Sequence, residues 1–201
     1  MRARDRFRGI FRHAVVAMIA VAIVCGAFAC VERERNKQEE YAVYSAYLSE
    51  GLLNDAHDWS TGGPVQVVIK NRTISGGNLR FRLLSMFDRR VRFNELQAFT
   101  WASYLARNLF RTPIQPTFAL PPRATPCITT DSEYGSQEFQ KKFPRNMGLV
   151  ALSGVGFNPS QSQAVFYIDH FCGLCGGGRY VLMKKVSGVW RVQDEHYAWI
   201  S

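Results

Sequence analysis

Four strand-like runs separated by short links fill the last quarter of the chain, and they constrain its fold more than any other feature. The runs read MGLVALSGVGF, SQAVFYIDHF, RYVLMKKV and VWRVQDEHYAWI, and the links between them are NPSQ, CGLCGGG and SG. Links this short join antiparallel neighbours, because a parallel connection needs a crossover of a dozen or so residues. The sequence therefore predicts a four-stranded antiparallel meander at the C-terminus.

Upstream of the meander, apolar residues recur at helical spacing in two places. A first helix is indicated by apolar residues three or four positions apart: Tyr41, Tyr44, Leu48 and Leu52. Residues 32–40 are too polar to be buried, so we expect them to extend this helix as a solvated stalk. A second amphipathic helix begins near Asn94, and its broad apolar surface holds Leu96, Phe99, Tyr104, Leu105 and Leu109.

The remaining segments complete an α+β domain. Residues 65–70 and 79–83 are expected to be strands, and residues 132–143 contain a short helix. Residues 112–126 hold five of the eight prolines, so they cannot form a central strand or a helix and instead form a covering loop or a proline-rich docking motif. We expect one domain over residues 55–201, in which the helices cover one face of the meander, as in cystatin-like or nuclear-transport-factor-like cones.

The first 31 residues have the composition of a signal peptide or a membrane anchor. Five arginines and one aspartate precede residues 14–31, a run of 18 residues without a charge. As a helix this run spans roughly 27 Å, enough for a thin bilayer. Three outcomes stay open: cleavage after Ala29, retention as an anchor, or lipidation at Cys30. Each outcome places residues 32–201 in the cell envelope or outside the cell.

The positive charge of the chain follows the same division. The net charge is +9, of which the first 13 residues supply +4. The rest of the chain is therefore only moderately basic, and an exported protein is unsuited to a nucleic-acid partner.

Residues 143–201 resemble a group of uncharacterised bacterial exported and envelope proteins. The shared elements are Ser-x-Val-Gly-Phe-Asn at 153–158, Ala-x-x-Tyr at 164–167, Cys-Gly-x-Cys-Gly at 172–176, Tyr-x-Leu at 180–182, Gly-x-Trp-x-Val at 188–192 and Trp-Ile-Ser at 199–201. Gly154 departs from the pattern, which suggests a bend or a close approach at that point. The resemblance implies export and a fold but no activity.

Cys172 and Cys175 stand between two strands and are followed by three glycines. A redox-active pair places its first cysteine at a helix N-terminus, which this context does not offer. A disulfide that closes the hairpin loop is the favoured interpretation for an exported chain. A thiol-redox pair stays open, as does a zinc site completed by His170 and Cys127.

The sequence predicts no catalytic residues. Asp169 and His170 are neighbours in a strand and point to opposite faces, and no Gly-x-Ser-x-Gly motif is present. Alternation along the last strand is expected to place His196 on the face of Asp194 and Trp190. The densest basic tract is a candidate contact for an anionic surface, and it contains Arg80, Arg82, Arg89, Arg90 and Arg92.

Together these features predict an exported, membrane-associated envelope protein that acts as a non-catalytic binding or structural module without a cofactor. Its N-terminal segment contacts the membrane, and another envelope protein is a candidate partner. Two alternatives remain, a small-ligand-binding or enzymatic cone with an apolar pocket and a thiol-redox or zinc-binding protein.

Overall fold

The computed structural model describes residues 34–53, 64–74, 93–130, 135–172 and 176–201. The chain divides at Glu40 into two units, and the second, Glu40–Ser201, includes most of the first helix. Among the described residues, no helix combines the length and the hydrophobicity that crossing a bilayer requires. Several predicted features lie outside the described residues: the leader at 1–31, the strand at 79–83 and the basic tract of Arg80, Arg82, Arg89, Arg90 and Arg92.

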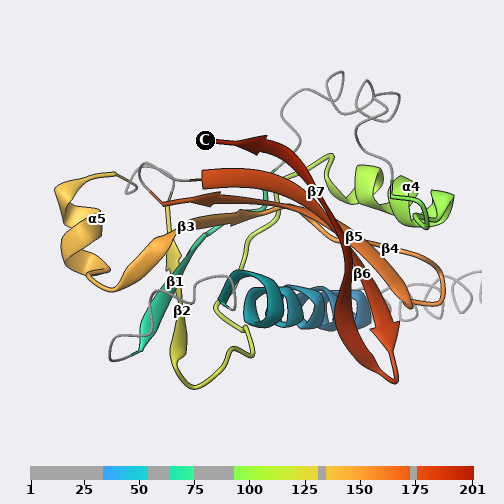
Figure 1. Cartoon of the computed structure of the whole chain (residues 1–201), viewed down its shortest axis with the longest axis horizontal. Coiled ribbons are helices and arrows are strands. Elements are labelled where there is room, and N and C mark those ends of the chain that lie inside the picture. Colours follow the sequence, from blue (N-terminus) through green and yellow to red (C-terminus); the bar gives the residue numbers. More distant parts are fainter. Residues whose placement is uncertain (1–33, 54–63, 75–92, 131–134, 173–175) are drawn as a thin grey trace, which may run out of the picture. The chain divides into compact units, whose positions relative to one another are not determined.

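A mixed seven-stranded sheet with a few helices forms the second unit, which is compatible with the predicted α+β class (Figure 1). The strand order is β2-β1-β3-β5-β6-β7, and the short strand β4 pairs with β5. Strands β3, β5, β6 and β7 are consecutive antiparallel neighbours, which is the predicted meander. The strands are β1 Val65–Lys70, β2 Ala124–Thr129, β3 Asn146–Leu152, β4 Gly156–Phe157, β5 Gln163–Phe171, β6 Gly176–Val186 and β7 Val189–Ile200.

Two strands outside the meander extend the sheet. β1 is at its predicted place and runs parallel to both β2 and β3. β2 begins inside the proline-rich tract and contains Pro126, so the end of this tract forms an edge strand in place of the expected covering loop. Residues 112–126 form neither a central strand nor a helix, as predicted. Because β2 is the edge strand, the missing amide hydrogen of Pro126 need not leave the ladder incomplete.

Helices cover both faces of the sheet, whereas the sequence analysis expected them on one. Alternate residues of β5 separate the two sides: Phe166 packs in the cluster of the first helix, and Val165 packs in the cluster of helix α4 (Ala98–Arg107). Helix α5 (Gln137–Lys142) covers Val68 and Leu149 of β1 and β3. Figure 1 shows the first helix and α4 on opposite sides of the strands.

The first helix forms where its apolar stripe predicted it. Residues 34–47 are α-helical and continue into a π-helical turn, η1 (Leu48–Leu52). Tyr44, Leu48 and Leu52 are buried against the sheet, as expected. Glu40 is also buried, so the prediction that residues 32–40 are too polar for burial was wrong at this position.

Helix α4 is shorter than predicted, and only part of the predicted apolar surface packs on the sheet, namely Leu96, Tyr104 and Leu105. It starts at Ala98 because Gln163 of β5 accepts hydrogen bonds from the Gln97 amide and the Thr100 hydroxyl, both at 2.9 Å. Its buried residues are Thr100, Trp101 and Tyr104. Phe99 and Leu109, which were expected on the apolar contact surface, are 71% and 54% exposed.

Candidate functional site

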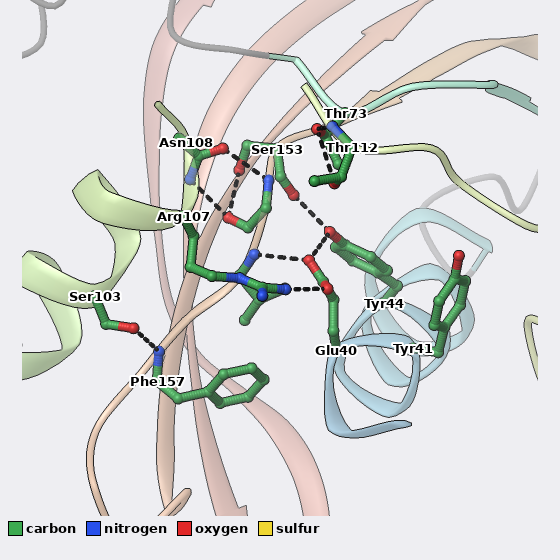
Figure 2. Close-up of polar contacts among 12 residues, drawn as sticks. Glu40, Tyr41, Tyr44, Thr73, Ser103, Arg107, Asn108, Thr112, Ser153 and Phe157 are labelled. Atoms are coloured by element: carbon green, nitrogen blue, oxygen red, sulfur yellow. Dashed lines mark hydrogen bonds and ion pairs between the residues drawn. The ribbon is translucent and has the colours of Figure 1, made fainter. Parts of the chain in front are cut away.

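The buried carboxylate of Glu40 is the centre of the most extensive polar cluster that Figure 2 draws. One carboxylate oxygen, Oε1, accepts hydrogen bonds from the Tyr44 hydroxyl at 2.9 Å and from the Val155 amide at 3.1 Å. The other, Oε2, accepts from the Arg107 guanidinium at 2.5 Å. Glu40 therefore joins the first helix, the β3–β4 segment and the last turn of α4.

The Tyr44 hydroxyl has one proton and two acceptors within reach. Besides Glu40, the carbonyl oxygen of Ser153 lies 2.6 Å from the hydroxyl oxygen. Burial, and then the nearby Glu40 carboxylate, raise the pKa of Tyr44 well above its ordinary value. Tyr44 therefore stays protonated and acts as a donor, and it is not a candidate general base near neutral pH.

The Asn108 side chain holds the end of α4 against the same segment. Its amide nitrogen donates to the Gly154 carbonyl at 2.9 Å and to the Tyr104 carbonyl at 2.8 Å, and its Oδ1 accepts from the Gly154 amide at 2.8 Å. The Gly154 peptide is thus paired on both sides by one side chain. An added Cβ at Gly154 would lie 3.4 Å from the Arg107 carbonyl oxygen, which is an ordinary contact, so the close approach suggested at this glycine is not found.

The hydrogen bonds of residues 153–158 hold the backbone of the fold together. The Ser153 hydroxyl accepts from the Tyr167 amide at 2.7 Å, and the Phe157 amide donates to Ser103 of α4 at 3.2 Å. Asn158 accepts from the Ser162 and Gln163 amides, at 2.9 and 3.0 Å, and thereby shapes the turn before β5. The hydrogen bonds of this motif organise the backbone and expose no reactive group.

A second polar cluster lies where β6 and β7 face the first helix. The Arg179 guanidinium donates to the Tyr197 hydroxyl at 2.8 Å and to the Glu195 carboxylate at 3.3 Å. It also lies 5.6 Å from the ring centre of Tyr47, whose buried hydroxyl makes no hydrogen bond of normal geometry among the described residues. Burial raises the pKa of Tyr47, and the positive charge of Arg179 opposes this shift.

On the opposite face, a third cluster lies directly on Gly178 of β6. Asp169 Oδ1 accepts from the Tyr167 hydroxyl at 2.6 Å and from the Trp199 indole at 2.9 Å. A Cβ at position 178 would lie 2.0 Å from the Tyr167 hydroxyl oxygen, so only glycine leaves room for this arrangement. Burial and the Asp169 contact raise the pKa of Tyr167, which therefore acts as a donor.

Asp169 and His170 point to opposite faces of β5, as predicted. The His170 ring nitrogen Nε2 lies 2.6 Å from the Met147 carbonyl oxygen, and burial lowers the pKa of His170. An unprotonated carbonyl oxygen can only accept, so the neutral ring carries its hydrogen on Nε2. Both side chains therefore have hydrogen-bond partners within the fold, Asp169 with Tyr167 and Trp199 and His170 with the Met147 carbonyl.

The structure does not bring Cys127 to His170. Cys127 is a free thiol on β2, and strands β1 and β3 separate it from His170 on β5. Three strand spacings amount to about 14 Å, which is too far for shared coordination of one zinc ion. In the described part of the chain, no three His, Cys, Asp or Glu side chains are close enough to hold a metal ion.

Cys172 lies at the end of β5. Cys175 lies outside the described residues, so the pairing of Cys172 with Cys175 stays a prediction.

A β-bulge changes the predicted faces of β7. The partner of Leu182 is Asp194, but the partner of the next residue, Met183, is Val192, so Gln193 is an extra residue in β7. The extra residue reverses the alternation. Trp190 therefore belongs to the cluster under the first helix, while His196 faces the other side beside Phe93, and the expectation that they share a face was wrong.

Sequence reasoning missed Glu40, Arg107 and Asn108. One signal for Glu40 was available, because Glu40 precedes Tyr44 by four residues and therefore continues the buried stripe by one turn. The partners of Glu40 come from 67 and 115 positions further along the chain, and no local pattern indicates them.

No protein-family model, curated protein or solved structure matches the chain at a significant level.

Proposed function

We propose that the chain is an exported, membrane-associated protein of the cell envelope that acts as a non-catalytic binding or structural module. The basic head and the charge-free run at residues 14–31 support export and membrane association. The predicted disulfide between Cys172 and Cys175 would fit an oxidising compartment. The resemblance of residues 143–201 to exported proteins agrees with both.

One observation favours a non-catalytic role: the Glu40 carboxylate is fully used inside the fold. Its two oxygens accept from Tyr44, Val155 and Arg107, and its side chain is only 9% exposed. A general acid or base must reach the proton that it transfers, whereas this carboxylate is enclosed by its own donors. Its arrangement is that of a structural ion pair.

A topology experiment tests the proposal on the full chain. A C-terminal reporter enzyme that folds only after its own disulfide forms should be active when fused to the wild-type chain, and the fusion should sediment with membranes. The double variant Val21→Asp, Ile23→Asp interrupts the apolar run and should abolish both results. Reporter activity only inside the cytoplasm, or a wild-type fusion that stays in the soluble fraction, would contradict the proposal.

A second candidate function, small-ligand binding beneath the first helix of a cone-like domain, has one observation in its favour. Within the described part of the chain, the buried Tyr47 hydroxyl makes no hydrogen bond of normal geometry, and polar groups lie near it: Arg179 lies 5.6 Å from the ring centre and donates to Glu195, which adds to the effect of burial in raising the pKa of Tyr47. An orphaned buried hydroxyl costs about 1–3 kcal/mol unless a ligand or a water satisfies it.

The Tyr47→Phe variant distinguishes the two functions. If the hydroxyl has no ligand, the variant should be at least as stable as wild type in urea unfolding. If a ligand is bound there, a small-molecule library should contain compounds that raise the melting temperature of wild type and leave that of Tyr47→Phe unchanged. Hits that shift both proteins equally do not bind through this hydroxyl.

A further inference from the structure

The outer face of α4 is apolar although nothing in the described part of the chain covers it. Phe99 is 71% exposed, Leu109 54% and Phe110 77%, and Ala102 and Ala106 between them are also exposed. Spacings of three, four and three residues place Phe99, Ala102, Ala106 and Leu109 along one side of the helix axis. The opposite side is buried on the sheet, so α4 lacks the polar outer face of an ordinary surface helix.

The charges along this segment are of one sign. Residues 98–111 contain two arginines, Arg107 and Arg111, and no acidic residue. Arg107 binds Glu40 yet keeps 37% of its side chain exposed, and Arg111 is exposed while its Nε donates to the Thr73 carbonyl. The nearest acid in the sequence, Glu95, precedes the helix and hydrogen-bonds to Gln193.

The β6–β7 hairpin adds a second apolar and basic feature on the same face of the sheet. Val186 and Val189 flank the Ser187–Gly188 turn and are 52% and 50% exposed. Val186 continues the row of Leu182, which packs in the α4 cluster, so its side chain points to the α4 side. Of the three bases next to this tip, Lys184 lies on the α4 side because it alternates with Leu182 and Val186. Lys185 instead lies over the ring of Trp190 in the first-helix cluster, and Arg191 forms an ion pair with Glu50.

We infer that the outer face of α4 and the tip of the β6–β7 hairpin, together the α4 surface, rest on a bilayer that contains anionic lipid. Protein segments that lie at a membrane interface typically combine exposed aromatic and aliphatic side chains with neighbouring basic residues. The apolar side chains enter the outer part of the acyl-chain region, and the basic side chains contact lipid phosphates. The inference rests on the proposed membrane association. Only residues 32–39 separate the leader from Glu40, so the chain length alone limits the distance from a membrane-bound leader to Glu40 to roughly 28 Å.

Photocrosslinking of the full chain in lipid nanodiscs tests this contact. A benzophenone side chain replaces Phe99 or Phe110, which are exposed aromatic positions that tolerate the change, and Lys141 of α5 serves as an exposed control position. In discs that contain phosphatidylglycerol, the yield of lipid adducts at positions 99 and 110 should exceed the yield at position 141 by about tenfold. Burial of an aromatic side chain in the bilayer stabilises the contact enough for a population ratio of this size. Discs of pure phosphatidylcholine should give fewer adducts at both positions.

Equal lipid yields at all three positions, or adducts to protein in place of lipid at positions 99 and 110, would overturn the inference. Protein adducts would identify a second copy or another segment of this chain as the occupant. This failure is distinguishable from failure of the proposed function, because a chain that sediments with cell membranes but gives no lipid adducts is membrane-associated through its leader alone.

Discussion

Gly156 of β4 lies directly beneath the backbone of Tyr104 in α4. A Cβ added to Gly156 would stand 2.3 Å from the Tyr104 amide nitrogen and 2.4 Å from its Cα. Because no side chain lies between α4 and β4 at this point, neither element can shift toward the other without a backbone clash. This contact fixes α4 on the sheet and thereby fixes what its outer face presents.

We expect Gly156→Ala to destabilise the domain strongly and Gly154→Ala to be tolerated. The nearest atoms to an added Cβ at Gly154 are 3.4 Å away, an ordinary contact, whereas at Gly156 the helix backbone must move. Overpacking of this kind costs about 1–3 kcal/mol, and Gly154→Ala should cost less than about 1 kcal/mol. Urea unfolding of the two variants measures the difference, and equal stabilities would refute the close contact.

Removal of the Glu40 carboxylate should destabilise the domain because the Val155 amide and the Arg107 guanidinium lose their acceptor, whereas Tyr44 can still donate to the Ser153 carbonyl. Breaking a buried ion pair costs about 3–5 kcal/mol, and the partial exposure of Arg107 reduces the expected loss for Glu40→Ala to about 2–4 kcal/mol. Glu40→Gln keeps one acceptor oxygen and should cost about 1–2 kcal/mol. Chemical denaturation gives these free energies of unfolding.

The exposed Glu138 of α5 provides the matched control, since Glu138→Gln should change the free energy by less than about 0.5 kcal/mol. A double-mutant cycle of Glu40→Ala with Arg107→Ala should show a coupling free energy of at least about 0.5 kcal/mol. Additive effects would mean that the pair does not link the first helix to α4.

His170 should make the domain less stable in weak acid. Burial lowers its pKa in the folded state below the ordinary value of 6.5, so the unfolded chain takes up a proton first as the pH falls. Above about pH 7.5 His170 is neutral in both the folded and the unfolded chain, so it does not change the free energy of unfolding. Below that pH the free energy of unfolding falls by up to about 1.4 kcal/mol per pH unit, until the pH has dropped below the pKa of His170 in the folded state.

The variant His170→Gln keeps an N–H donor for the Met147 carbonyl but does not titrate. Unfolding curves at pH 7.5, 6.5 and 5.5 (values chosen about the ordinary histidine pKa) should therefore show a smaller loss for the variant than for wild type. Identical losses in the two proteins would assign the acid sensitivity to other groups.

The predicted Cys172–Cys175 disulfide should contribute little to global stability. It closes a loop of about four residues, for which the loop-closure entropy predicts roughly 2 kcal/mol or less. Urea unfolding with and without reductant, repeated on the variant Cys172→Ala, Cys175→Ala, measures this contribution. Complete unfolding on reduction would show that the bridge does more than close its hairpin.

The sequence predicted the elements whose signals are local. Alternation and short links indicated β3, β5, β6 and β7, and the stripe at Tyr44, Leu48 and Leu52 indicated the first helix. These patterns succeed because burial of one face leaves a period in the neighbouring residues.

The rest depended on contacts that no short stretch contains. The start of α4 is set by Gln163, which lies 63 positions beyond Thr100, and burial of Glu40 is set by Arg107 and Val155. The bulge at Gln193 inserts one residue without a proline or glycine to mark it, so alternation gave the wrong face for Trp190. Phe99 and Leu109 were assigned to the core because hydrophobicity alone does not distinguish a buried face from an exposed contact surface.

Mass spectrometry of the protein taken from its native compartment, alkylated without reductant under denaturing conditions, tests the central claim of export most directly. We expect Cys127 to be labelled, and Cys172 and Cys175 to acquire the label only after reduction, because an oxidising space keeps them paired. Labelling of both Cys172 and Cys175 before reduction, on a chain that retains its arginine-rich start and is dissolved in the cytosol, would contradict the account.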